Sequence, residues 1–259
     1  MTKRCMLTSL PGVVLVLSAC AGPALVPITS PDAGEAPPDA GAPRLVRLVY
    51  AMQAEPDERA AFEAIRASVP AARADVELSA ALLVFGARGQ ALVQPFAPPD
   101  TLARRSFSPA ALKIAEGMAG PLQVEHGHAA VADLVVADFE TLSSAERQRV
   151  EYRVVFLTEG SLHATACLQR ASCQPADVAQ ICCTQQVIGN SRRLRSIVEL
   201  WSASRVTLQP VAIGEAAQRS TFERVLLMSL AREGGTTLVE TTLAELPTTL
   251  TTVAAHLAE

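Results

Sequence analysis

The sequence predicts an α/β fold: a doubly wound, mostly parallel central sheet with one antiparallel edge hairpin and helices on both faces. Short apolar runs alternate along the chain with helical patterns, which is typical of strand–helix–strand units. The runs are apolar throughout, as expected of strands that helices cover on both sides. The chain has 259 residues, of which 49% are hydrophobic, so it can fill a sizeable core.

The strands are predicted from these apolar runs. The first, residues 44–52, reads RLVRLVYAM and has bulky β-formers on both faces. The second, 76–86, is nearly all apolar and is therefore expected to be buried. After a turn at Arg88 and Gly89, residues 91–96 return as an antiparallel edge strand. The remaining strands are predicted at 153–158, 205–214 and 236–240.

Helices are predicted between the strands. Asp57 can cap the first helix, 57–69, and Ser108 with Pro109 provides an N-cap and a first-turn residue for the helix 108–118. The other helices are predicted at 129–142, 191–203, 220–231 and 243–258. Because no internal repeat and no second Pro/Gly-rich linker interrupts this order, we expect one domain over residues 44–259.

Residues 1–19 have the features of a secretory signal peptide. Lys3 and Arg4 precede the apolar run 6–17, which is too short to cross a bilayer as a mature helix. The tetrapeptide Leu-Ser-Ala-Cys at 17–20 resembles the bacterial lipoprotein box, and the resemblance implies that Cys20 carries the lipid and becomes the first mature residue. Ala21 then favours an outer-membrane location, because a lipoprotein retained in the inner membrane often has Asp there.

A tether is predicted between the lipid anchor and the domain. Residues 20–43 are rich in Pro, Ala, Gly and acidic residues and show no period, so we expect an extended, semi-rigid segment. The formal net charge of −4 argues against a nucleic-acid partner. An acidic domain is also not expected to seek anionic headgroups, so the membrane contact would come from the lipid anchor alone.

The order of the elements, with one antiparallel hairpin after the second strand, resembles the von Willebrand factor A domain, also called the integrin inserted domain. Four local sequences agree with the family's strand and helix ends: AALLVFG (80–86), RVVFLTEG (153–160), VTLQPVAIG (206–214) and LAREGG (230–235). The resemblance extends over residues 44–259. It implies the α/β fold predicted above and a binding site at the carboxyl ends of the strands.

The family's metal-ion-dependent adhesion site is degenerate in this sequence. That site needs Asp-x-Ser-x-Ser after the first strand. In one alignment Ala51 occupies the Asp position, and Gln53 and Glu55 occupy the Ser positions. In the other alignment Tyr50 occupies the Asp position. If Tyr50 takes that place, the Ser places hold Met52 and Ala54. Neither alignment supplies the first carboxylate that the family's site uses.

The family's other two ligand positions are also altered. The middle loop, 123–134, has no Thr, and His126, Gly127 or His128 lies near that place. We expect Gly127 to mark a loop in which both histidines are exposed; the alternative is a metal cluster. Glu159 replaces the Asp of the family's Thr-Asp-Gly, and its extra methylene moves the carboxylate by more than the near-octahedral geometry of Mg²⁺ tolerates.

We therefore expect no metal site of the usual type and no cofactor, with Glu159 a solvated acid at a strand end. The alternative is a rearranged Mg²⁺ or Mn²⁺ site that uses Gln53, Glu55 and Glu159.

Four cysteines lie in an insertion, residues 160–190, that follows Glu159: Cys167, Cys173, Cys182 and Cys183. An even number in an exported chain predicts two disulfides, and the spacing fits no zinc pattern. Because a bond between the adjacent Cys182 and Cys183 would be strained, each of them is expected to pair with Cys167 or Cys173, in an order that stays open.

The position of this insertion favours a role in recognition. It leaves the carboxyl edge of the sheet, where doubly wound folds bind their ligands. We expect its exposed residues, such as Gln169 and Arg170, to dominate the binding of a partner. The alternative is a loop that is cross-linked only for resistance to proteases.

No catalytic motif is found in the sequence: no Gly-x-Ser-x-Gly elbow, no phosphate-binding loop and no His-Glu-x-x-His. The prediction is therefore an envelope-anchored lipoprotein, not an enzyme, that binds an envelope or surface protein in adhesion or complex assembly. A metal-dependent adhesin with a rearranged site is the first alternative, and a periplasmic hydrolase is the second.

Overall fold

The computed structural model describes residues 42–54, 58–86, 89–104, 124–158, 189, 206–214 and 221–258. The chain divides into two units, 1–37 and 38–259, and all the described residues lie in the second. The helices predicted at 108–118 and 191–203 lie outside the described residues.

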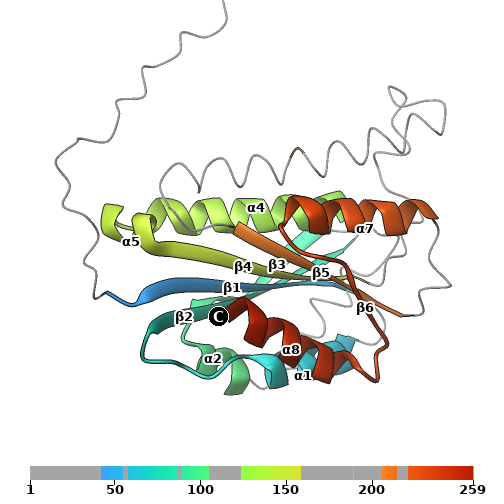
Figure 1. Ribbon diagram of the computed structural model, residues 1–259, viewed down its shortest axis with the longest axis horizontal. Coiled ribbons are helices and arrows are strands. Elements are labelled where there is room, and N and C mark those ends of the chain that lie inside the picture. The colour runs from blue at the N-terminus through green and yellow to red at the C-terminus, as the bar shows by residue number, and fades with distance from the viewer. Residues whose placement is uncertain are drawn as a thin grey trace, which may run out of the picture. The chain divides into compact units, whose positions relative to one another are not determined.

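A six-stranded sheet, in the order β3-β2-β1-β4-β5-β6, forms the middle of the fold (Figure 1). All neighbouring strands are parallel except β2 and β3, which are antiparallel. The prediction of a mostly parallel sheet with one antiparallel edge pair is thus confirmed. The strands are β1 (Arg44–Gln53), β2 (Val76–Gly86), β3 (Gly89–Ala97), β4 (Val150–Thr158), β5 (Val206–Ile213) and β6 (Val239–Thr241).

Helices cover both faces of the sheet. In Figure 1, α4 and α7 lie on one face, and α1, α2 and α8 lie on the other. The short helices α2 and α5 are additions to the predicted elements. The helices are α1 (Glu58–Ser68), α2 (Pro99–Arg104), α4 (Val124–Thr141), α5 (Ser144–Arg149), α7 (Thr221–Glu233) and α8 (Leu246–Ala258). Among the described helices, none is both long and apolar enough to span a membrane.

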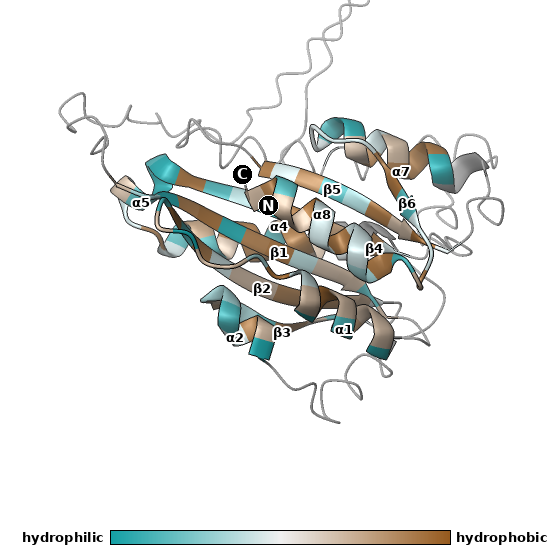
Figure 2. Ribbon diagram, turned by 60° about the horizontal axis from the view of Figure 1, so that its bottom comes forward, coloured by the Kyte–Doolittle hydropathy of each residue, from teal (hydrophilic) through white to brown (hydrophobic). Residues whose placement is uncertain are grey.

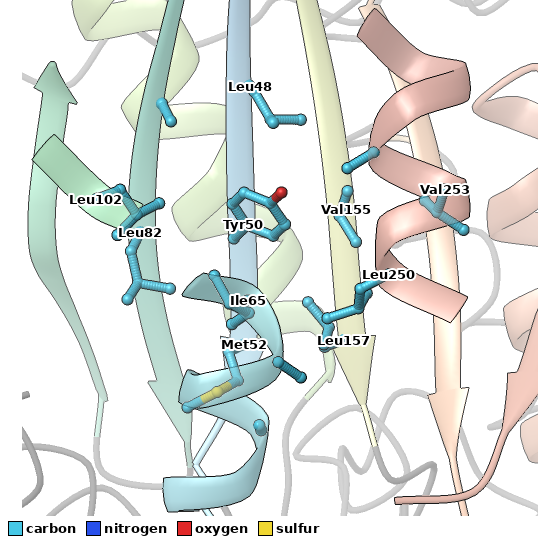
Figure 3. Close-up of a cluster of buried hydrophobic side chains, with 14 of the residues drawn as sticks. Leu48, Tyr50, Met52, Ile65, Leu82, Leu102, Val155, Leu157, Leu250 and Val253 are labelled. Atoms are coloured by element: carbon cyan, nitrogen blue, oxygen red, sulfur yellow. The ribbon is translucent and has the colours of Figure 1, made fainter. Parts of the chain in front are cut away.

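Two apolar cores follow from the alternation of side chains along each strand. On β1, Leu48 and Tyr50 pack with α1 and α8, as Figure 3 shows for Ile65 and Leu250. The alternate residues of β1, such as Val49, pack on the opposite face with side chains of α4 and α7. Figure 2 shows the apolar stretches of the strands between the two helix layers. Because both faces are covered, the strands are apolar throughout, as the sequence indicates.

The predicted loop around His126, Gly127 and His128 is wrong, because α4 begins at Val124 and includes all three residues. Gly127 is buried and lies against Phe85 of β2: a Cβ added at Gly127 would be 2.4 Å from Cδ2 of that ring. The glycine therefore allows close packing of a helix on the sheet.

The boundaries of the last two elements also differ from those predicted. The strand β6 covers only 239–241, because Thr236 lies in the turn that follows α7: its amide donates to the carbonyl of Ala231 at 2.9 Å, and its hydroxyl donates to the carbonyl of Leu208 at 2.6 Å. The last helix begins at Leu246 rather than at residue 243, since Thr242 and Glu245 close a turn before it.

Candidate functional site

The carboxyl ends of four neighbouring strands bring one row of residues together. Gln53 of β1 pairs in register with Phe85 of β2, and Thr158 of β4 pairs with Ala212 of β5. The pair Met52 and Leu157 is the last between β1 and β4 that is in register, so Gln53 and Thr158 lie side by side beyond it. We call Phe85, Gln53, Thr158 and Ala212 the carboxyl-end row.

The two polar residues of the row are joined by a hydrogen bond inside the protein. The hydroxyl of Thr158 donates to Oε1 of Gln53 at 2.5 Å. The exposed fraction is 3% for Gln53 and 0% for Thr158. Buried polar groups are nearly always hydrogen-bonded, and this bond between two strands provides a partner for the hydroxyl of Thr158 and for Oε1 of Gln53.

Aromatic rings and α4 enclose the row on one face of the sheet. Phe85 stacks on Phe156 of β4, with ring centroids 4.9 Å apart and an interplanar angle of 20°. Gly127 of α4 lies on the ring of Phe85. By alternation along β1 and β4, Gln53 and Thr158 point to the same face as Phe156. The row is therefore buried at the carboxyl ends of the strands.

The structure places both candidates for the first metal-ligand position inside the sheet rather than at the strand end. Tyr50 is completely buried on the α1 face, where its hydroxyl lies 3.1 Å from Oγ of Ser68. Ala51 is equally buried and pairs with Phe156 inside the sheet. Because β1 stays paired with β2 through Gln53, the position that the strand presents at its end is Gln53.

Most of the other residues predicted for the site lie outside the described residues. These are the alternative metal ligands Glu55 and Glu159, the lipidation site Cys20, the cysteines Cys167, Cys173, Cys182 and Cys183, and the partner contacts Gln169 and Arg170. Of the three ligands of the predicted rearranged site, Gln53, Glu55 and Glu159, the structure describes Gln53. Within the described ranges, no group of three or more His, Cys, Asp or Glu residues is arranged to hold a metal ion.

A second polar cluster holds α4 against the sheet, and sequence reasoning missed it. Asp138 of α4 accepts a 2.6 Å hydrogen bond from the hydroxyl of Tyr152, and Nε of Arg47 lies 3.3 Å from the same Oδ2. Arg47 also donates to Oγ of Ser79 at 2.6 Å. Burial, and then the hydrogen bond to Asp138, raises the pKa of Tyr152. We call Arg47, Asp138 and Tyr152 the α4 anchor.

A third cluster lies at the opposite, amino end of the sheet. Arg44 makes a two-point contact with Glu151, at 3.0 and 2.8 Å, and Arg153 pairs with the same carboxylate. The hydrogen bond to Glu151 raises the pKa of Arg44, while burial lowers the pKa of Arg153. Arg149 donates to the carbonyl of Pro43 at 2.6 Å. These contacts fix the point at which the chain enters β1.

The sheet order, the single antiparallel edge pair and the helices on both faces define a von Willebrand factor A-like fold. No protein-family model matches the sequence, and no curated protein matches it. Among solved structures, the von Willebrand factor domain of the type V pili tip protein Mfa5 from Porphyromonas gingivalis is similar. It has 8% sequence identity and a TM-score of 0.50, and the match covers 84% of this chain and 96% of that one.

The PilB minor pilin from Streptococcus sanguinis has the same fold, at 8% identity and a TM-score of 0.50. That match covers 84% of this chain but only 62% of the pilin, which is less than two thirds of its length. The D319A mutant of the same pilin matches at 10% identity and a TM-score of 0.50. At these identities the likeness shows the fold alone.

Proposed function

We propose that this protein is an envelope-anchored lipoprotein that binds another protein, in adhesion or complex assembly, at the carboxyl edge of its von Willebrand factor A-like domain. The fold is the observation that carries the proposal. Two structures that share it are a minor pilin and a domain of a pilus tip protein. Both names refer to components of pili.

The two ends of β1 support the same arrangement. The chain enters at Pro43 and Arg44, and the carboxyl-end row lies at the other end of the strand. A strand of 10 residues is about 33 Å long, at about 3.3 Å per residue. The carboxyl edge therefore lies about one strand length from Arg44, where the predicted tether would join the domain.

The chemistry of the row supports binding without catalysis. Its hydroxyl, on Thr158, donates to the amide oxygen of Gln53. A general base has to take a proton within the working pH range, and a neutral amide does not do so. The row therefore offers no activated nucleophile, and we propose a binding surface formed by the loops above it.

The experiment is affinity capture from membranes with the full-length protein, followed by identification of the captured protein. We expect capture to be lost in Gln169→Ala and Arg170→Ala, and to be kept in the control Arg224→Ala, which changes an exposed residue of α7. Cys20→Ser should move the protein from the membrane to the soluble fraction. If no protein is captured, or if the two insertion variants capture it as well as the unchanged protein does, the proposal is wrong.

A further inference from the structure

The carboxyl-end row stands where the family resemblance implies a divalent cation. Its side chains are a phenyl ring, an amide, a hydroxyl and a methyl group, so the row contains no carboxylate. The amide of Gln53 and the hydroxyl of Thr158 are its only oxygen-bearing side chains, and they bind each other at 2.5 Å. Both oxygens are neutral, whereas sites for Mg²⁺ in proteins usually include one or two carboxylates.

A cation would have to break this hydrogen bond to use both oxygens. The hydroxyl of Thr158 would turn its proton away from Gln53, so that a lone pair could face the ion. That change would break a hydrogen bond between two residues with almost no exposed surface, and losing a buried hydrogen bond is costly. No negative charge in the row would offset this loss or the dehydration of the ion.

Burial leads to the same conclusion. Mg²⁺ holds its water ligands tightly and usually keeps several of them when it binds to a protein. Gln53 and Thr158 have almost no exposed surface, and the stacked rings of Phe85 and Phe156 lie on the same face of the sheet. The two oxygens of the row therefore have almost no exposed surface at which a hydrated ion could bind.

We propose that the hydrogen bond between Thr158 and Gln53 takes the place of a divalent cation at the carboxyl end of the sheet, so that the binding edge keeps its shape and binds its partner without metal. The inference rests on the proposed function and states how that same edge is maintained. A glutamine suits this role because its amide oxygen accepts the hydroxyl proton without placing a charge in a buried row.

The role of the hydrogen bond is tested with two substitutions of one residue. Thr158→Val removes the hydroxyl and keeps the shape, while Thr158→Ser keeps the hydroxyl and serves as the control. In the presence of a chelator, we expect Thr158→Val to lower the melting temperature by about 2–8 °C, and Thr158→Ser to lower it by less. Equal melting temperatures for the valine variant and the unchanged protein would overturn the role given to the bond.

Metal independence is tested on the unchanged protein, so it does not depend on the folding of a variant. Calorimetric titration with Mg²⁺, Mn²⁺ or Ca²⁺ should show no saturable binding, and the melting temperature should be the same with metal and with chelator. Stoichiometric binding that raises the melting temperature overturns the inference. If Glu159→Ala abolishes that binding, the metal is bound at the rearranged site predicted at Gln53, Glu55 and Glu159.

Repeating the membrane capture with chelator separates this inference from the proposed function. Capture that persists in chelator supports both. Capture that occurs with divalent metal and is lost in chelator overturns the inference and leaves the proposed function standing. If nothing is captured in either condition, the proposed function fails, and the calorimetric titration alone decides whether the row binds metal.

Discussion

Tyr152 of β4 donates a 2.6 Å hydrogen bond from its hydroxyl to Oδ2 of Asp138 on α4. Arg47 of β1 lies 3.3 Å from the same oxygen, so one carboxylate of the helix is held from two strands. Near its start, α4 is fixed again where Gly127 meets the ring of Phe85. Because Phe85 belongs to the carboxyl-end row, these two contacts set the position of α4 along the sheet and over that row.

Tyr152→Phe is expected to lower the free energy of unfolding by about 1.5–3 kcal/mol, because it removes a hydrogen bond to a charged, mostly buried acceptor. The control is Tyr50→Phe, which removes a hydroxyl that lies 3.1 Å from Ser68. That bond joins two neutral groups, and Ser68 keeps its own bond to the carbonyl of Ile65. Urea unfolding of both variants is the measurement. An equal or larger loss in Tyr50→Phe would contradict the role assigned to Asp138.

The two tyrosines of the chain should not ionise at their ordinary pH while the protein is folded. Tyr50 and Tyr152 are the only tyrosines, and burial raises the pKa of each, with the hydrogen bond to Asp138 adding to the effect at Tyr152. Above a pH of about 10 the unfolded chain releases these protons and the folded protein keeps them. The free energy of unfolding is therefore unaffected by them at lower pH and falls as pH rises above that value.

A titration of phenolate absorbance with and without urea checks this expectation. The unfolded protein should show both tyrosines ionising at a pH of about 10, and the folded protein should show neither until it unfolds. Reversible ionisation of one tyrosine at that pH, with circular dichroism unchanged, would mean that its hydroxyl is open to water.

The strands were predictable because burial on both faces leaves a strong local pattern. The run 76–86 contains almost no polar residue, and it is β2 from the first residue to the last. The start of α4 was not predictable from local pattern, because a glycine is ordinarily a poor helix former. Gly127 is favoured in the helix because the ring of Phe85 leaves no room for a larger side chain. Since Phe85 lies on a strand that is distant in the sequence, only the three-dimensional structure shows this contact.

The candidate site was predictable in part for the same reason. Gln53 could be named from its place after the first strand, but its partner Thr158 is 105 residues away, and only the register of β1 and β4 brings the two together. The α4 anchor was not predictable from the sequence, because Arg47 and Asp138 do not differ from other charged residues of a strand and a helix.

Glu151→Gln is expected to lower the free energy of unfolding by about 1–3 kcal/mol, because Arg44 and Arg153 share its carboxylate. The side chain of Glu151 is 9% exposed and that of Arg44 is 39% exposed, so solvent screens the pair only in part. The control is Asp75→Asn. It breaks a pair with Arg73 whose side chains are 49% and 61% exposed, and solvent screens such exposed pairs so that they contribute little to stability.

Urea unfolding at low and high salt distinguishes these two pairs. Salt screens exposed charges far more than buried ones. The loss in Asp75→Asn should therefore shrink as salt is added, while most of the loss in Glu151→Gln should remain. If salt removes both losses alike, the cluster at the amino end is a surface feature and does not fix the entry of the chain.

Gly127→Ala tests the contact that places α4 on the row. In an open helix this change would stabilise by about 1 kcal/mol, because alanine is the better helix former. Here the added methyl group would lie 2.4 Å from the ring of Phe85, which is stacked on Phe156 and has little freedom to move. We therefore expect a net loss of about 1–3 kcal/mol in the free energy of unfolding, as for other overpacked cores.

Two further variants isolate the cause of that loss. Ala137→Gly, at an exposed position of the same helix, should cost about 0.5–1 kcal/mol and so show the ordinary helix preference. Gly127→Ala combined with Phe85→Leu should lose less than the sum of the two single changes, because the smaller side chain makes room for the methyl group. Additive losses, or a more stable Gly127→Ala, would show that the ring and the helix are not in close contact.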